Sequence, residues 1–305
     1  MTATPDGERQ TAQAFSDKWH HSRRLAFDQT LAEGSDIQRW ILTRNGLQDL
    51  DGLRAWLSGR GRVLDAGCGN GRVTALLRRY AASTTEIVGV DLTAADVAAD
   101  NLSGEPNLRI ETRDLRGDLS GLGRFDLIYC QEVLHHTGDA ADAFRNVAEL
   151  LAPGGEIAIY VYKVKAPLRE FTDDYVRDRV ADLPYDEAMT AMRQLAGLGR
   201  ALSELEAEVT VPDVDVLGLP GGTYDVQRLI YDFMAKAFWS PELGDEGSAS
   251  VNFDWYRPQL ATRHRLEEVE DWFAASGLRV IHRHVDASGI TVRGVAPVTT
   301  PSSEN

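Results

Sequence analysis

Asp65, Gly67, Gly69 and Gly71 have residue types and a spacing suited to binding a ligand along the main chain. Glycine lets the backbone adopt φ > 0 and lets a ligand approach it closely. Residues 62–64 indicate the end of a strand, and the apolar residues of 73–80 recur at helical spacing. A strand, a glycine turn and a helix open a nucleotide-binding βαβ unit, and the start of its helix favours negative charge.

A second acid stands where such a unit needs one. Asp91 ends the predicted strand 86–91, 20 positions after Gly71. A carboxylate at that place can accept hydrogen bonds from the ribose hydroxyls of a nucleoside. Further strands are predicted at 108–112, 125–130 and 157–162, the last after a turn at 151–156. Strands that alternate with helices predict a mainly parallel sheet with helices on both faces.

Three segments resemble one known family. The pattern Asp-x-Gly-x-Gly-x-Gly from Asp65 is similar to motif I of the class I S-adenosylmethionine (SAM) methyltransferases, whereas the dinucleotide fingerprint is G-x-G-x-x-G. This loop alone leaves SAM and a nicotinamide cofactor open. The segments FDLIYCQEVLHHT (125–137) and LLAPGG (150–155) also resemble that family and favour SAM. The segments YVYKVKAPLREFTDDYVRD (160–178), VNFDWYRP (251–258) and RHRLEEVEDWF (263–273) further resemble a subgroup of that family with a large insertion after the fifth strand.

The resemblance implies a Rossmann-like α/β fold whose seven-stranded, mainly parallel sheet has helices on both faces and an antiparallel last strand. It implies SAM as the cofactor. In that family the first acid contacts the amine of SAM directly or through water, and an acid after the third strand contacts the adenine amino group. The cofactor-binding residues predicted in this way are Asp65, Gly67, Cys68, Gly69, Asp91, Leu92, Asp114, Leu115 and Gln131.

Residues after the fourth and fifth strands are candidates for the acceptor side of a reaction. His136 is predicted as a general base, because histidine transfers protons near neutral pH. Glu170 is a second catalytic candidate. Residues predicted to bind the acceptor are His135, Tyr162, Trp255 and Tyr256, with Tyr160, Asp254 and His264 as weaker candidates. No metal is expected, because the adjacent acids Asp173 and Asp174 have no evident third ligand.

The chain is predicted to divide into six segments. A disordered N-terminus (1–13) precedes helices at 14–57, which in related methyltransferases cover the cofactor, and a SAM-binding core at 58–162. Residues 163–262 are predicted as a mostly helical cap insertion that binds the acceptor, with helices at 168–182, 186–206 and 223–238 and a loop at 243–250. A helix and a β-hairpin at 263–296 complete the sheet, and 297–305 form a disordered tail.

Composition narrows the class of partner. The 305 residues carry a formal net charge of −15, which argues against a nucleic-acid acceptor because phosphates favour a basic face. No apolar run approaches the length of a membrane span. The two cysteines, Cys68 and Cys130, stand in the glycine loop and near a strand end, so a disulfide framework is not expected. These features predict a cytoplasmic protein without nucleic-acid or membrane partners, and a homodimer is left open.

The leading hypothesis is a SAM-dependent methyltransferase that acts on a small molecule such as a natural product, a sugar or another metabolite. One alternative is an enzyme of the same fold that transfers or cyclises the aminocarboxypropyl group of SAM and releases methylthioadenosine. A further alternative is a non-catalytic SAM-binding protein. The acceptor, the methylated atom and the metal requirement are left open.

Overall fold

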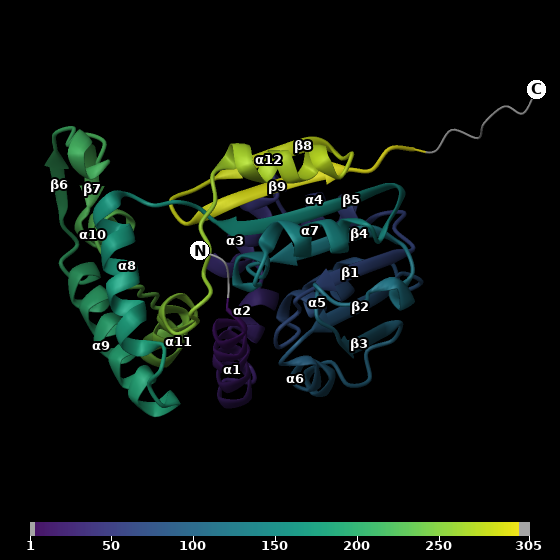
Figure 1. Ribbon diagram of the computed structural model, residues 1–305, viewed down its shortest axis with the longest axis horizontal. Coiled ribbons are helices and arrows are strands. Elements are labelled where there is room, and N and C mark those ends of the chain that lie inside the picture. The colour runs from purple at the N-terminus through teal and green to yellow at the C-terminus, as the bar shows by residue number, and fades with distance from the viewer. Residues whose placement is uncertain (1–3, 299–305) are drawn as a thin grey trace, which may run out of the picture.

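A seven-stranded sheet forms the centre of the computed structural model, which describes residues 4–298 (Figure 1). Its strands, in spatial order, are β3 (Leu108–Thr112), β2 (Glu86–Asp91), β1 (Arg62–Ala66), β4 (Phe125–Gln131), β5 (Leu151–Tyr162), β9 (Gly289–Val295) and β8 (Arg279–Val285). Strands β1 to β5 are parallel, and β9 is antiparallel to both β5 and β8. The predicted Rossmann-like fold with an antiparallel last strand is confirmed.

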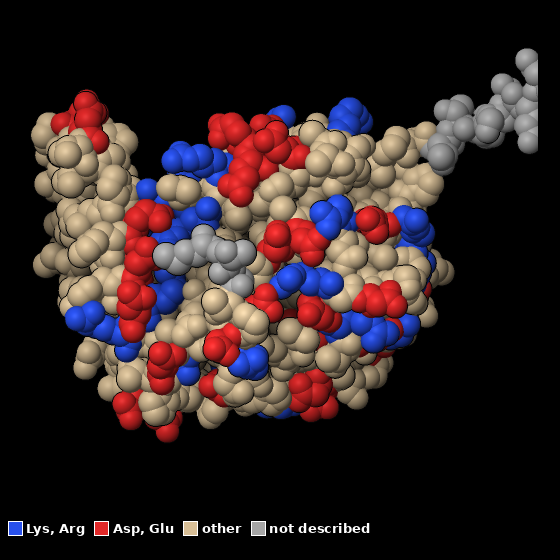
Figure 2. Space-filling model, viewed as in Figure 1, with Lys and Arg blue, Asp and Glu red and all other residues tan. Residues whose placement is uncertain are grey.

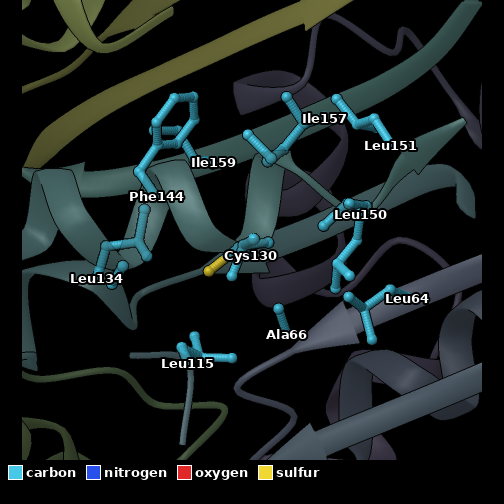
Figure 3. Close-up of a cluster of buried hydrophobic side chains, with 14 of the residues drawn as sticks. Leu64, Ala66, Leu115, Cys130, Leu134, Phe144, Leu150, Leu151, Ile157 and Ile159 are labelled. Carbon is cyan, nitrogen blue, oxygen red and sulfur yellow. The ribbon is translucent and has the colours of Figure 1, made fainter. Parts of the chain in front are cut away.

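Both faces of the sheet are buried, which explains the continuous apolar runs of its strands. Because side chains alternate along a strand, Leu64 of β1 packs in one core and Val63 in the other. The first core, part of which Figure 3 shows, lies against α7 (Ala140–Ala148) and α12 (Leu266–Ala275). The second core contains apolar residues of the helices that cover the other face, namely α3 (Asp36–Arg44), α4 (Leu50–Leu57) and α5 (Arg72–Tyr80).

Helix α1 (Pro5–His21) corrects the prediction of disorder at residues 1–13. The Thr4 side chain accepts a hydrogen bond from Gly7 N at 3.2 Å, and Pro5 occupies the first turn, so the helix has a defined start. Its buried face includes small and polar residues such as Thr11 and Ala14, which give little apolar signal in the sequence. Residues 1–3 lie outside the described residues. After α1 come α2 (Phe27–Leu31), α3 and α4.

Residues 163–262, which we call the cap segment, form a lobe beside the sheet (Figure 1). Its elements are α8 (Pro167–Val180), α9 (Tyr185–Ser203), β6 (Glu208–Val211), β7 (Gly222–Asp225), α10 (Val226–Phe233) and α11 (Gly244–Tyr256). Strand β7, which pairs antiparallel with β6, replaces the start of the helix predicted at 223–238, and α10 ends at Phe233. The loop predicted at 243–250 is wrong, because those residues are almost all in α11. Ser248 and Ala249 are fully buried there, so tertiary packing outweighs the weak helix propensity of a Gly/Ser-rich stretch.

The last elements close the edge of the sheet. Helix α12 is followed by Gly277 at φ 68° and then by the hairpin of β8 and β9, as predicted. Strand β5 differs from the prediction, because its pairing with β4 begins at Leu151 and resumes at Glu156 across an irregularity. Helix α6 (Ala95–Asn101) packs beside β2 and β3. Of the tail predicted to be disordered, residues 299–305 lie outside the described residues.

Candidate active site

The glycine loop between β1 and α5 has the backbone that its composition predicts. Gly67, Gly69 and Gly71 have φ of 84°, 54° and 84°, a region that residues with a side chain rarely occupy. A Cβ on Gly67 would lie 2.3 Å from the Val133 side chain, and one on Gly69 would lie 2.8 Å from Trp19. Substitution there would therefore be both strained and crowded.

Asp65 lies under this loop and is buried. Its Oδ2 accepts a hydrogen bond from Thr74 Oγ1 at 2.6 Å. Burial raises the pKa of Asp65 to about 6, although the Thr74 hydroxyl and the Arg72 guanidinium act in the opposite direction. A cationic ligand group beside Asp65 would favour its ionised form, so this carboxylate is suited to an ammonium.

Asp91 ends β2 and faces the same loop. Its Oδ2 accepts a hydrogen bond from Gly69 N at 2.9 Å. Its Oδ1 accepts from Thr93 N at 2.8 Å and from Ala94 N at 2.9 Å. Since each carboxylate oxygen has two acceptor sites, Oδ2 retains capacity for a further donor. Asp91 therefore orders the loop and still has an acceptor site for a ligand.

All nine residues predicted to bind the cofactor line one cavity of ≈ 760 Å³. Asp114 stands at its edge, exposed, with Oδ1 accepting from Arg116 N at 2.9 Å. Leu92 is 52% exposed although it is a large apolar residue, as expected of a side chain that can pack against a ligand. The structure thus brings together residues from the loops after β1, β2, β3 and β4. This convergence at the carboxyl ends of parallel strands is where open α/β sheets bind ligands.

Helix α1 closes the cavity between the sheet and the cap segment. Phe15, Lys18 and Trp19 line it. Lys18 Nζ lies 2.6 Å from Asp254 Oδ2 in the cap segment, and Glu8 pairs with Arg116 of the core at 2.5 Å. In Figure 1, α1 lies between α11 and the sheet. The helix therefore contacts both parts of the molecule that surround the cavity.

His136 lines the cavity beyond the cofactor-binding residues. Its Nδ1 lies 2.7 Å from Leu260 O, and because a carbonyl oxygen can only accept, Nδ1 carries the proton. The neutral ring then has its lone pair on Nε2. Burial lowers the pKa of His136 to about 3, although the bond to Leu260 opposes this. The side chain is half-buried, because it is enclosed by protein yet borders the cavity.

Aromatic side chains surround the space next to His136. The ring of Tyr162 lies 5.4 Å from that of His136 and 4.1 Å from that of Trp255. Tyr162, Trp255, Tyr160 and Asp254 all line the cavity, as the sequence predicts for residues of the acceptor side. This part of the cavity is therefore largely aromatic with a few charged groups.

Three predicted site residues do not line this cavity, and those predictions are corrected. His135 is fully buried and its ring stacks on Tyr162 at 3.7 Å. Tyr256 is fully buried and donates its hydroxyl to Asp173 Oδ1 at 3.0 Å. Glu170 accepts from Lys165 N at 2.7 Å and pairs with Arg263 at 2.7 Å, so its carboxylate is used to hold the start of α8. The weaker candidate His264 also lies elsewhere, bonded to Glu268.

Charged residues that sequence reasoning missed lie at the cap end of the cavity, among them Arg44 and Lys236. Glu132, for which the sequence predicted no chemical role, has φ 61° and pairs with Arg44 at 3.2 Å. Burial alone would raise the pKa of Glu132, but Arg44 and Arg72 outweigh it and hold that pKa below its ordinary value. Backbone strain of this kind clusters at functional sites, and Glu132 also lines the cavity. The signal for Lys236 in the sequence was its rarity, since lysine occurs four times in the chain.

Three further observations concern metal ligands, membrane-spanning helices and surface charge. Among residues 4–298, no group of three or more His, Cys, Asp or Glu side chains is arranged to hold a metal ion. Within the same range, no helix is both long enough and apolar enough to cross a membrane. On the face shown in Figure 2, acidic and basic side chains are intermixed over the core.

Comparison with known proteins finds similarity in the part of the chain around the glycine loop. A family model described as a methyltransferase domain matches residues 64–157. A ubiquinone biosynthesis O-methyltransferase of Coxiella burnetii is 34% identical over 98 residues, which cover 31% of this chain and 41% of that protein. A protein of the same name from Pseudomonas aeruginosa is 32% identical over 108 residues, or 34% of this chain and 45% of that protein. The chain thus spans less than half the length of these curated relatives.

Among solved structures, the N-methyltransferase NodS from Bradyrhizobium japonicum, in complex with S-adenosyl-L-homocysteine, has a TM-score of 0.46 and 14% identity. That alignment covers 92% of this chain and 99% of NodS. The match of residues 64–157 lies within the sheet and includes the glycine loop, Asp91 and Asp114. Residues 64–157 therefore match a methyltransferase domain, and they contain the glycine loop and the parallel strands that are typical of class I, S-adenosylmethionine-dependent enzymes.

Proposed function

We propose that this protein is an enzyme that transfers the methyl group of SAM to a small-molecule acceptor bound under the cap segment. The observation that carries the proposal is the single cavity of ≈ 760 Å³, which runs from the nine predicted cofactor residues to His136 and the aromatic residues of the cap side. A volume of this size is typical of small-molecule sites. SAM supplies the electrophilic methyl group.

The residues at the cofactor end fit the groups of SAM. We assign Asp65 to the amine, Asp91 to the ribose hydroxyls and Asp114 to the adenine amino group. Each of these ligand groups is a hydrogen-bond donor, and each residue is a carboxylate, which accepts. The glycine loop, free of side chains above its backbone, leaves room for the methionine part of the cofactor.

The remaining residues supply position and proton transfer. Methyl transfer is an in-line displacement, so most of the rate comes from holding the acceptor atom on the methyl axis in a site closed to water. We propose that Tyr162 and Trp255 orient the acceptor and that α1 closes the site. If the acceptor loses a proton, Nε2 of His136 is the proposed base, because Nδ1 donates to Leu260 O and leaves the lone pair on Nε2.

The identity of the acceptor is not carried over from the relatives. Their similarity is confined to about a third of this chain, around the cofactor-binding part, whereas the acceptor end is built largely from the cap segment. We propose a metabolite of a biosynthetic pathway as the acceptor and no nucleic acid, in view of the net charge of −15. A cytoplasmic location is proposed on the free state of Cys68 and Cys130, both buried. The oligomeric state stays a prediction to be measured.

The test is product analysis. The protein is incubated with SAM and a panel of phenols, amines and sugar hydroxyls, and the products are separated by mass spectrometry. S-adenosylhomocysteine together with an acceptor heavier by one methylene unit is the expected result. Methylthioadenosine in its place would mean aminocarboxypropyl chemistry. Tight SAM binding without either product, across a panel that includes acids and neutral molecules, would favour the non-catalytic alternative.

A further inference from the structure

The chain uses lysine very sparingly, and its lysines gather in one place. Of 32 basic residues four are lysines, at positions 18, 163, 165 and 236. Lys18, Lys165 and Lys236 are all buried, with 5%, 8% and 5% of their surface exposed. Arginine serves at the other cationic positions. A lysine ammonium is a compact point charge that is rarely buried without a partner. Each of the three buried lysines is therefore expected to contact a carboxylate or another hydrogen-bond acceptor.

Two of the three have partners within the protein. Lys18 Nζ lies 2.6 Å from Asp254 Oδ2. Lys165 Nζ donates to Ala287 O at 2.8 Å and to Ser288 O. Lys236 is different: among residues 4–298 no carboxylate oxygen lies within 4.0 Å of its Nζ. Its ammonium lies 4.6 Å from the centre of the Trp255 ring and lines the cavity.

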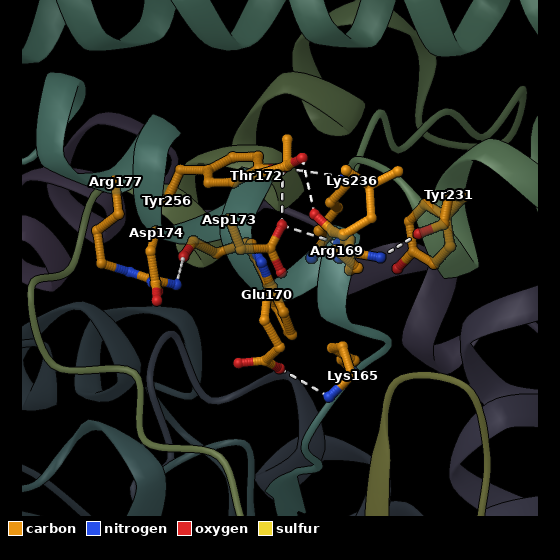
Figure 4. Close-up of polar contacts among 12 residues, drawn as sticks. Lys165, Arg169, Glu170, Thr172, Asp173, Asp174, Arg177, Tyr231, Lys236 and Tyr256 are labelled. Carbon is orange, nitrogen blue, oxygen red and sulfur yellow. Dashed lines mark hydrogen bonds and ion pairs between the residues drawn. The ribbon is translucent and has the colours of Figure 1, made fainter. Parts of the chain in front are cut away.

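The position of Lys236 is held by a buried network, part of which Figure 4 shows. Its backbone N donates to Tyr256 Oη at 3.0 Å. The Tyr256 hydroxyl donates to Asp173 Oδ1, which also pairs with Arg169 at 2.8 Å. The main chain at Lys236 is thus tied to α8 and α11. The backbone from which the Lys236 side chain reaches the cavity wall is therefore held in place.

The two carboxylates that raise the pKa of Lys236, Asp254 and Glu132, form ion pairs with other cations. Asp254 pairs with Lys18, and Glu132 pairs with Arg44 at 3.2 Å and with Arg72 at 3.9 Å. Burial lowers the pKa of Lys236, and Arg169 lowers it further, while Tyr231 and the two carboxylates oppose this. Lys236 therefore adds a positive charge to the cavity wall that an anion would offset.

We propose that Lys236 binds an acidic group of the acceptor, a carboxylate or a phosphate, so that the substrates of this enzyme are organic acids with an aromatic or apolar body. The inference rests on the proposed function and specifies its acceptor. The acidic group lies at Lys236 and the body packs against the aromatic side chains. Trp255 contributes to this contact and Tyr231 lines the same end of the cavity. SAM carries a net positive charge, which increases the attraction for an anionic acceptor.

The experiment measures the binding of matched probes to the protein saturated with S-adenosylhomocysteine. Calorimetry compares benzoate with benzamide, and phenyl phosphate with benzyl alcohol. The wild-type protein is expected to bind at least one acid roughly 10- to 100-fold more tightly than its neutral partner, the range of one hydrogen bond to a charged group. Which acid is preferred distinguishes a carboxylate from a phosphate acceptor.

Three variants locate the effect. Lys236→Met is expected to lose the preference for acids and keep the affinity for the neutral probes. Lys236→Arg is expected to retain part of the preference. Lys163→Met is the matched control, because Lys163 is a half-buried lysine of the same segment that does not line the cavity, and it is expected to behave as wild type. Circular dichroism at rising temperature checks that each variant is folded.

The outcomes separate the two proposals. If the acids bind no better than the neutral probes, including the case in which none binds, the anionic acceptor is overturned. A preference that survives in Lys236→Met overturns the assignment to this residue, as does an equal loss for acids and neutral probes. S-adenosylhomocysteine affinity is measured on the same samples. A wild-type protein that fails to bind it would contradict the proposed function itself, independently of the probes.

Discussion

The two ends of the cavity differ in how they are built and in their charge. The cofactor end consists of loops that follow four neighbouring strands, and its acids Asp65, Asp91 and Asp114 face donors of the cofactor in our proposal. The cap end consists of side chains from α1, β5 and the cap segment, with buried cations among aromatic rings. One end is thus suited to a cationic nucleoside and the other to an anion.

Because they are built differently, the residues of the cofactor end and those of the cap end can change independently of one another. The cofactor end depends on backbone shape and on acids at strand ends, which the parallel sheet places together. The cap end depends on how separate helices pack, so a change of packing there would alter the acceptor and leave the cofactor loop intact. Helix α1 is the exception, because it contacts both ends.

Asp91→Ala is expected to give the largest effect and to act on the cofactor end. A hydrogen bond to a charged acceptor contributes about 1.5–3 kcal/mol, so loss of the one that Oδ2 can accept from the ribose reduces the affinity for S-adenosylhomocysteine roughly 10- to 100-fold. Loss of the bond from Gly69 N, which orders the glycine loop, adds to this effect. Calorimetry measures it. Because Asp91 also accepts from backbone N–H groups of Gly69, Thr93 and Ala94, some loss of stability is expected as well. Asp91→Asn is the control that keeps one acceptor oxygen, and an unchanged affinity in folded Asp91→Ala would refute the ribose assignment.

Lys18→Met tests whether α1 joins the two ends. The change leaves Asp254 buried without its partner, and breaking such a pair costs up to about 3–5 kcal/mol, less where the acid takes up a proton. Urea denaturation gives the free energy of unfolding. Arg23→Met, just after the end of α1, is the matched control. The Arg23–Asp100 pair is exposed, so it is expected to contribute less than about 1 kcal/mol to the free energy of unfolding. Equal losses for both variants would contradict a special role for the Lys18 contact.

His136→Gln tests the boundary between the two ends, where the methyl group meets the acceptor. Loss of a general base is expected to lower kcat by about 100-fold, with the affinity for S-adenosylhomocysteine unchanged. Steady-state kinetics on an acceptor found in the product screen measures it. His20→Gln, a change on the exposed side of α1, serves as the control. A kcat that is unchanged in His136→Gln would exclude this residue as the base.

The two neighbouring histidines give a pH dependence of stability. Burial lowers the folded-state pKa of His135 and His136 below the ordinary value of 6.5, to about 3 for His136. The unfolded chain therefore takes up protons first, so this contribution is present above pH 6.5 and is lost as the pH falls. His136→Gln is expected to reduce that loss by about 1.4 kcal/mol per pH unit between about pH 6 and 5. Asp65, whose raised pKa acts in the opposite direction, is common to both proteins and cancels in the difference.

Glu170→Gln is expected to have the smallest effect. The carboxylate contacts Lys165 N and Arg263 rather than the cavity, so kcat and KM stay within about twofold of wild type. Partial exposure limits the loss of stability to about 1 kcal/mol. Kinetics and urea denaturation measure the two quantities, with Glu204→Gln at the end of α9 as a surface control. A large fall in kcat would restore Glu170 as a catalytic residue.

The cofactor end could be predicted because each of its parts is a local pattern. The glycine loop, Asp91 and Asp114 each follow a recognisable strand, and parallel strands bring such positions to one edge. All nine predicted residues accordingly line the cavity. The start of α1 was missed because its buried face is small and polar, and α11 was missed because its Gly/Ser-rich stretch is helical through packing alone.

At the cap end, residues adjacent in the sequence differ in whether they line the cavity. His135 and His136 are adjacent, yet one is sealed in the core and the other lines the cavity. Trp255 and Tyr256 differ in the same way, because successive residues of a helix point about 100° apart. Which member of each pair faces the cavity depends on the position of the whole helix. The sequence therefore predicted that histidine and aromatic side chains line the cavity, but not which residue of each adjacent pair does so.

The alternation of strands and helices, the glycine turn and the acids of the cofactor end follow from the amino-acid sequence, because hydrophobic periodicity and glycine positions that allow φ > 0 are local properties of the chain. The cap end depended on tertiary contacts, which enclosed α1, turned Glu170 and Tyr256 away from the cavity and, among residues 4–298, placed no carboxylate oxygen within 4.0 Å of Lys236 Nζ. The physical reason is that burial and pairing depend on contacts between residues far apart in the chain, which no local pattern contains.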